Sequence, residues 1–183
     1  MNRWMYRFIG LLGLLFLFTS NGCDPVGPTD TVTLTANKEF FFTFASGDGQ
    51  TKTRSLTSDN KIDIADVLAA QNFTKAALTS GTLDTAVLEV IFPTGVPVSF
   101  LQGIKLSLSA AGLPTREVAS QVNFPTGVNE DTVTLTIDAL EDITPYLRAE
   151  SFSGKLDITA NTLLLNREYE LNVRLKLLAR VNF

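Results

Sequence analysis

In residues 31–44, hydrophobic and polar side chains alternate with a period of two. This is the pattern of a β-strand that buries one face and exposes the other. Phe40, Phe42 and Phe44 fall on the apolar side, so we expect aromatic rings in the core. Ser46–Gln50 follows with two glycines, which favour positive φ, and it predicts a turn.

Further segments show the same alternation, mostly with Val, Ile, Leu or Phe on one face and Thr, Ser, Asp or Lys on the other. Such strands predict antiparallel sheets packed on a shared core. About seven or eight of them in residues 31–183 predict an all-β fold, an antiparallel β-sandwich with one or two short helices. The further strands are expected at Leu83–Phe92, Val98–Ala110, Glu117–Phe124, Thr132–Ala139, Phe152–Ala160 and Glu168–Phe183.

Two stretches depart from this period. Asp63–Gln71 reads as a short helix, with Asp59 or Asp63 near its N-terminus, where a carboxylate can accept hydrogen bonds from free backbone N–H groups. Asp142–Leu147 predicts one helical turn, because Pro145 is well tolerated in a first turn. We expect both helices to close an open end or edge of the sandwich.

The last predicted strand, Glu168–Phe183, alternates without a break. Every odd position in it is apolar, and most even positions are polar or charged, among them Glu170, Arg174 and Lys176. This pattern predicts a long central or edge strand of the sandwich. An exposed edge would offer its unpaired backbone groups to a strand added by a partner.

Phe41 lies between two core-facing phenylalanines and is therefore expected to point away from the core. An exposed aromatic ring can mark a partner or ligand surface. The other interpretation, which we prefer, is a sheet edge covered by a loop. Phe41 and the polar side of the last strand together form one candidate partner surface, which consists of Phe41, Glu170, Arg174 and Lys176.

The first 22 residues have the organisation of an export signal. Arg3 and Arg7 flank a start that is rich in aromatic residues. An apolar run of about eleven residues, Phe8–Phe18, follows, whereas a membrane-spanning helix needs roughly 20. Small and polar residues then lead to Cys23, the only cysteine of the chain.

The run Ser20-Asn21-Gly22-Cys23 resembles the lipobox of bacterial lipoproteins, which signal peptidase II cleaves before the cysteine. Its last two residues match that pattern, whereas Ser20 replaces the usual aliphatic residue and Asn21 is atypical. The resemblance implies a signal peptide over 1–22 and lipidation of Cys23, with several acyl chains that anchor the protein in a membrane. Plain secretion stays open as an alternative, because the small residues of the run also suit signal peptidase I, and an uncleaved anchor is the other alternative.

Residues 23–30 then read as the lipidated cysteine and a short tether, in which two prolines and a glycine prevent regular structure. Asp24 resembles the inner-membrane retention signal of enteric lipoproteins, a rule that other Gram-negative groups do not follow. We expect an exported protein that is lipid-anchored to the cell envelope, at the periplasmic or surface face of the outer membrane, with the inner membrane as the alternative.

The composition excludes several classes of function. The 183 residues include 15 Lys and Arg, 19 Asp and Glu, and no histidine. The acidic balance gives no electrostatic footprint for nucleic acid. The lack of histidine excludes Ser-His-Asp and Cys-His catalysis and His-ligated metals, and a single cysteine excludes an intramolecular disulfide. The domain must therefore be held together by its hydrophobic core.

Carboxylates are the remaining candidates for chemistry. Asp59, Asp63 and Asp66 lie close together, as in some calcium sites, but their spacing is not that of an EF-hand loop, and helix-start roles explain the last two better. Glu130-Asp131 and Glu141-Asp142 read as turn charges. The chain has no G-x-S-x-G motif and no phosphate-binding loop. We therefore predict no catalytic residues, no metal site and no cofactor.

One short motif occurs twice, as Phe92–Val96 and as Phe124–Val128, both reading FPTGV. Proline followed two residues later by glycine is good turn chemistry. We interpret the repeat as reuse of a turn, with an old duplication and a ligand loop as alternatives.

These features predict a membrane-anchored envelope or surface lipoprotein whose β-sandwich is a non-catalytic interaction or structural domain, with a protein or glycan partner. Two other functions stay open: a pilus-like filament subunit that exchanges strands, and a carrier that holds a hydrophobic molecule between its sheets. An enzyme is disfavoured because of the narrow set of reactive side chains.

Cys23→Ala tests the anchor. The substitution removes the sulfur that accepts the acyl chain, so we expect loss of palmitate labelling and release of the protein from the membrane fraction. Metabolic labelling and fractionation measure both. A variant that still labels and still sediments with membranes would show that the lipidation prediction is wrong.

Overall fold

The structure is a computed structural model that describes residues 31–45, 53–122, 124, 130–138, 141–160 and 168–182. Residues Thr31–Asn182 form one compact unit. No helix in these described ranges is long and apolar enough to cross a membrane. Several predictions lie outside the described residues: the signal peptide over 1–22, Cys23 with its tether, the turn at Ser46–Gln50, and Pro125–Val128 of the repeat.

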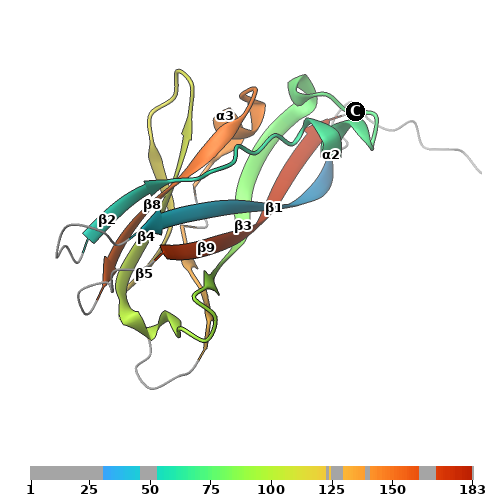
Figure 1. Ribbon diagram of the computed structural model, residues 1–183. Coiled ribbons are helices and arrows are strands. Elements are labelled where there is room, and N and C mark those ends of the chain that lie inside the picture. Colours follow the sequence, from blue (N-terminus) through green and yellow to red (C-terminus); the bar gives the residue numbers. More distant parts are fainter. Residues whose placement is uncertain are drawn as a thin grey trace, which may run out of the picture. The chain divides into compact units, whose positions relative to one another are not determined.

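The described strands form two sheets (Figure 1). The four-stranded sheet has, in spatial order, β1 (Thr31–Ala45), β9 (Glu168–Asn182), β3 (Leu78–Phe92) and β6 (Thr132–Thr134). The five-stranded sheet has the order β2 (Thr53–Thr57), β8 (Phe152–Ala160), β4 (Leu101–Ala110), β5 (Arg116–Val122) and β7 (Thr136–Ile137).

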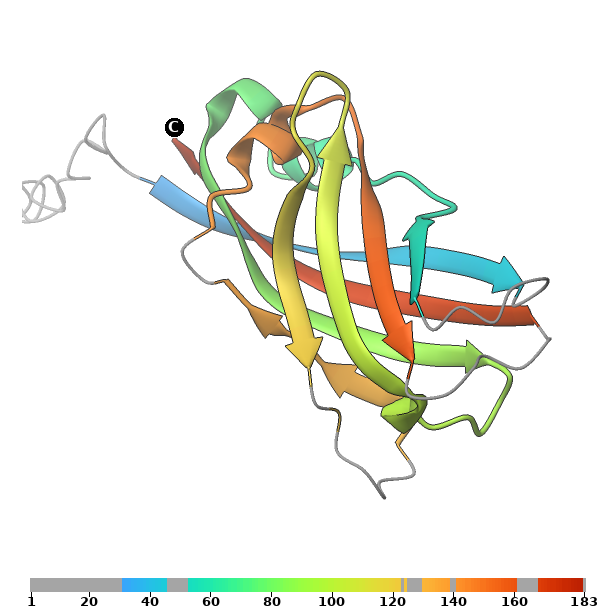
Figure 2. The ribbon, with the colours of Figure 1, turned by 90° about the vertical axis from the view of Figure 1, so that its left-hand side faces the viewer.

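All pairings between these strands are antiparallel. Figure 2 shows the two sheets as two layers, with the strands of one layer crossing those of the other. The hydrophobic core lies between the layers and draws buried residues from both. The prediction of an all-β antiparallel sandwich is therefore confirmed.

Strand alternation builds this core as the sequence predicts. In β9, each odd residue from Tyr169 to Val181 is at most 3% exposed. In β1, Phe40 and Phe42 are buried, and Phe40 packs edge-to-face on Phe42 and on Phe152 of β8, with ring centroids 6.3 and 6.0 Å apart. The two layers are thus joined by aromatic contacts at their centre.

β9 is a central strand, not an edge. It pairs with β1 over Thr31–Ala45 on one side and with β3 over Leu78–Phe92 on the other. Both rows of its backbone hydrogen-bonding groups are therefore engaged inside the sheet. The idea that this strand offers an open edge to a partner is wrong.

The clearest alternating run, Thr132–Ala139, is not one strand. β6 pairs with β3 in one sheet, and β7 pairs with β5 in the other. Between them Leu135 is buried, and its N–H donates to the carbonyl oxygen of Ala86 at 2.9 Å. The run alternates because the chain crosses between the layers while one side stays against the core.

Other boundaries also differ from the sequence predictions. β2 was not expected, because its sequence TRSLT carries one apolar residue, Leu56. β3 begins at Leu78, five residues before the predicted start at Leu83. β4 begins at Leu101, because the 3-10 turn η2 (Val98–Phe100) occupies the predicted first residues.

Both predicted helices are present in shortened form. α2 (Ala65–Ala69) packs on β1, and the N–H of Ala65 donates to Oδ1 of Asp63 at 2.9 Å, as the helix-start interpretation requires. α3 (Thr144–Arg148) has Pro145 in its first turn and buries Tyr146 and Leu147. It packs against β3 and β4, and so against a strand of each sheet.

The first copy of the repeated motif is a turn. Gly95 has φ +75°, and the N–H of Val96 donates to the carbonyl oxygen of Pro93 at 3.3 Å. The positive φ explains the glycine, since L side chains rarely adopt it.

Gly154→Ala tests the packing between the layers. A Cβ at this position of β8 would lie 2.7 Å from Cδ2 of the Phe40 ring. Because this ring is packed on two others, we expect destabilisation by about 1–3 kcal/mol, measured by urea unfolding. Gly103→Ala is the matched control, since its Cβ would meet no atom closer than 3.9 Å. Equal stability of the two variants would contradict the packing argument.

Candidate binding face

The four residues of the candidate partner surface come together on one side of the four-stranded sheet. The β1–β9 register places Phe41 opposite Asn172, which lies between Glu170 and Arg174 on β9. We call the outward-pointing side chains of this region the outer face. It consists of Asn37, Glu39, Phe41 and Thr43 of β1, Glu170, Asn172, Arg174 and Lys176 of β9, and Thr85, Val87 and Glu89 of β3.

Ion pairs across the strands fix the cations of the outer face. Nη2 of Arg174 lies 3.3 Å from Oε2 of Glu89, and Nζ of Lys176 lies 2.8 Å from Oδ2 of Asp84. Each pair is partly exposed, so its contribution to stability is about 1 kcal/mol or less. Each pair instead orients its cation, because the cation is held beside a carboxylate and does not move freely in solvent.

The segment that leads from β2 to α2 covers the neighbouring edge of β1. The N–H of Phe41 donates to Oδ1 of Asn60 at 2.9 Å, and Nδ2 of Asn60 donates to the carbonyl oxygen of Glu39 at 2.8 Å. The N–H of Asp59 donates to the carbonyl oxygen of Phe41 at 2.7 Å. The Asn60 amide thus takes the place of a neighbouring strand.

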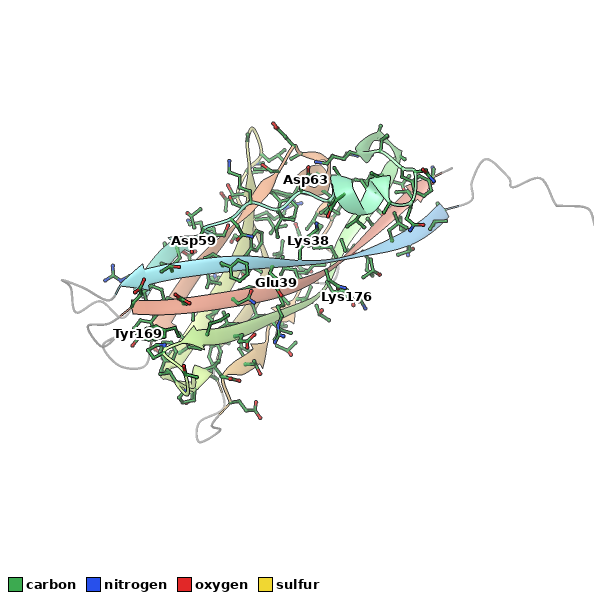
Figure 3. The ribbon with its side chains drawn as sticks, turned by 45° about the vertical axis from the view of Figure 1, so that its right-hand side comes forward. Lys38, Glu39, Asp59, Asp63, Tyr169 and Lys176 are labelled. Carbon is green, nitrogen blue, oxygen red and sulfur yellow. The ribbon has the colours of Figure 1, made fainter. Side chains whose placement is uncertain are left out.

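The same segment forms one wall of an open groove of about 790 Å³. The strands below supply Glu39, Phe41 and Arg174, and the wall runs from Asn60 to Asp66. Figure 3 shows Glu39 and Lys176 on the sheet side of this region, Asp63 on the wall, and Lys38 between Glu39 and Asp63. The volume falls in the range of small-molecule sites, about 300–1,000 Å³.

A salt bridge joins the wall to the sheet. Nζ of Lys38 lies 2.9 Å from both carboxylate oxygens of Asp66, which is exposed on α2. The hydrogen bond and the charge of Lys38 hold the pKa of the Asp66 carboxyl below its ordinary value.

The three aspartates considered for calcium are each engaged elsewhere. Oδ2 of Asp59 accepts from the hydroxyl of Thr43 at 2.8 Å, Asp63 pairs with Lys75 at 2.6 Å, and Asp66 pairs with Lys38. Partial burial raises the pKa of Asp63, but Lys75 and the Ala65 N–H outweigh it and leave this pKa lowered. In the described ranges no three Asp, Glu, Cys or His side chains converge as a metal site would require.

Both interpretations of Phe41 apply to different parts of the residue. Its backbone lies on a sheet edge covered by the Asp59–Asn60 segment, as the preferred interpretation holds. Its side chain is nevertheless 43% exposed and borders the groove. The ring is therefore available to a ligand while its backbone is fixed.

Asn172 is the residue of this face that sequence reasoning missed. It occupies an even, outward-pointing position of β9, yet it is only 5% exposed, and its side-chain oxygen has no hydrogen-bond partner within the described ranges. The one sequence signal was its chemistry, since a short neutral amide stands between the charged positions 170 and 174. Burial by neighbouring strands is not visible in that pattern.

Comparison with known proteins adds no assignment. No protein-family model matches the chain, and no curated protein matches it. Among solved structures, a chain of Desmodium yellow mottle tymovirus is 12% identical, with 85% of this chain and 92% of that chain covered and a TM-score of 0.29. A likeness this low carries no argument about function.

Asn60→Ala tests the closure of the β1 edge. It removes two hydrogen bonds to the β1 backbone, so we expect a loss of about 1–2 kcal/mol in unfolding free energy and faster hydrogen exchange at the Phe41 amide. Asn37→Ala is the control, because Asn37 also lies exposed on β1 but its side chain makes no hydrogen bond within the described ranges. Unchanged exchange at Phe41 in Asn60→Ala would contradict the strand-like role of Asn60.

Proposed function

We propose that the protein is a membrane-anchored envelope or surface lipoprotein whose β-sandwich binds a partner through the outer face and performs no catalysis. The anchor rests on the lipobox-like run that ends at Cys23. Its expected place is the periplasmic or surface face of the outer membrane. A folded domain held near the membrane by a short tether suits a protein that presents a binding surface there.

One observation carries the binding proposal: an exposed aromatic ring, Phe41, borders a groove that is lined by charged and amide side chains together with Ile62, Val87 and Leu175. Aromatic rings are over-represented where proteins recognise partners, because a rigid ring contributes contact area at low entropic cost. In β1, the neighbouring rings of Phe40 and Phe42 are buried, so Phe41 is not required by the core.

Three aspartates of the described residues are held as fixed charges. The pKa values of Asp63, Asp66 and Asp142 are all lowered. For Asp142 the cause is the hydroxyl and the N–H of Thr144, which both donate to Oδ1. A general acid needs a pKa raised toward neutrality, so these groups suit fixed charges that orient ligands and neighbours.

The geometry supports this proposal more than the two other functions. Strand exchange needs an open edge, but β9 is paired on both sides and Asn60 closes the Glu39–Phe41 part of the β1 edge. A carrier needs room between the sheets, but at the centre Phe40 packs on Phe152 and leaves no space for a Cβ at Gly154.

Site-specific photo-crosslinking in the native cells tests the proposal. A benzophenone-bearing phenylalanine in place of Phe41 keeps an aromatic ring at the outer face of the full, anchored chain. On irradiation we expect a covalent adduct, seen as a shift on a denaturing gel.

The control places the same amino acid at Val122, which is 63% exposed at the end of β5 in the other sheet. An adduct at position 41 and none at position 122 is the expected result. If the chain stays unmodified at both positions, the outer face has no partner and the proposed function is wrong.

A further inference from the structure

Asn172 is a neutral amide that is buried on the outward-pointing side of β9. Its neighbours along the chain, Leu171 and Val173, are in the core, so its own side chain lies on the outer face. There its oxygen is buried with no hydrogen-bond partner within the described ranges. Burying an unsatisfied acceptor costs free energy that an apolar residue would avoid, and such a group in a folded protein calls for an explanation.

The residues around Asn172 bear on whether a ligand could reach its oxygen. Across the sheet its register partners are Phe41 on β1 and Glu89 on β3, and Arg174 follows on the same side of β9. Phe41 is itself 43% exposed, so a change in its side-chain rotamer meets solvent and not core. Phe41 and Arg174 line the groove and Asn172 does not, so a ligand in the groove would reach the Asn172 oxygen only once the Phe41 side chain moves aside.

The charges of the groove are balanced. When the charged residues that line it are counted with their ion-pair partners, cations and carboxylates are equal, at five each. Lys38, Arg174 and Lys176 each lie beside a carboxylate. The groove therefore has no excess of either charge to attract a polyanion or a polycation. Its paired groups act instead as fixed hydrogen-bond donors and acceptors.

We propose that the outer face binds a neutral glycan chain, with the Asn172 side-chain oxygen accepting a hydrogen bond from a sugar hydroxyl and the Phe41 ring packing on the C–H face of a sugar ring. This inference rests on the proposed function and names the class of its partner.

A neutral glycan matches the groove in three respects. Its hydroxyls both donate and accept, as the mixture of Glu39, Asn60 and Arg174 around the groove requires. Its rings have an apolar face suited to a single exposed aromatic side chain. A short stretch of such a chain can be accommodated in an open groove of about 790 Å³. A protein partner of standard size would be expected to meet a larger exposed aromatic and aliphatic centre than Phe41 with Ile62, Val87 and Leu175.

The test identifies what is attached at position 41 in the photo-crosslinking experiment. The adduct is purified, digested and analysed by mass spectrometry. We expect added masses of neutral sugar residues on the peptide that carries position 41, and loss of the gel shift after periodate oxidation.

Asn172→Val supplies the second measurement. Valine suits a central strand and removes the unsatisfied oxygen, so we expect the melting temperature of the full chain to stay the same or to rise. The adduct yield at position 41 is expected to fall at least fivefold, because the sugar hydroxyl loses its acceptor. Arg180→Ala is the matched control, because Arg180 lies exposed further along the same side of β9 and outside the groove. Its adduct yield is expected to stay unchanged.

The outcomes separate this inference from the proposed function. An adduct made of peptides from another protein, or from a second copy of this chain, keeps the proposed function and overturns the glycan. Sugar masses that carry uronate, sulfate or phosphate overturn the neutral ligand. An unchanged yield in Asn172→Val overturns the role of Asn172. No adduct at all removes the proposed function itself. The mass spectrometry that identifies the adduct uses the protein with Asn172 intact. The glycan proposal is therefore tested even if the Asn172→Val variant folds poorly.

Discussion

The double pairing of β9 is the constraint on which the rest of this structure depends. A strand that is hydrogen-bonded to β1 and to β3 along its length has both backbone edges satisfied, and its side chains then divide between two faces. Its odd residues become the centre of the core, and its even residues become the middle column of the outer face. The core and the candidate binding face are therefore two sides of the same element.

Side chains as well as strands satisfy the backbone hydrogen-bonding groups of this sheet. An open edge invites pairing with other chains. Here the Asn60 amide satisfies the backbone of β1 at Glu39 and Phe41 from within the same chain. This closure fixes the backbone under the exposed Phe41 ring, and it also raises one wall of the groove. One short connection thus closes part of an open edge and forms one side of a surface groove.

Asn172 contrasts with Asn60, because its side-chain oxygen is left without a hydrogen-bond partner within the described ranges. Burial of this unsatisfied oxygen costs free energy that an apolar side chain would not incur. Functional surfaces commonly carry such local costs, because an acceptor with no partner inside the protein keeps its full capacity for a ligand. The large, well-packed aromatic core around Phe40 is the part of the molecule that can offset such a cost.

The sequence by itself determined the alternation of faces, and with it the antiparallel sandwich, the burial of Phe40 and Phe42 and the exposure of Phe41, Glu170, Arg174 and Lys176, because side-chain direction in a strand follows from position alone. The neighbours of each strand were decided only by tertiary structure. Pairing in space made β9 central, sent Thr132–Ala139 into two sheets, put the polar β2 at an edge and buried Asn172. These outcomes depend on contacts between residues far apart in the chain, which no local pattern records.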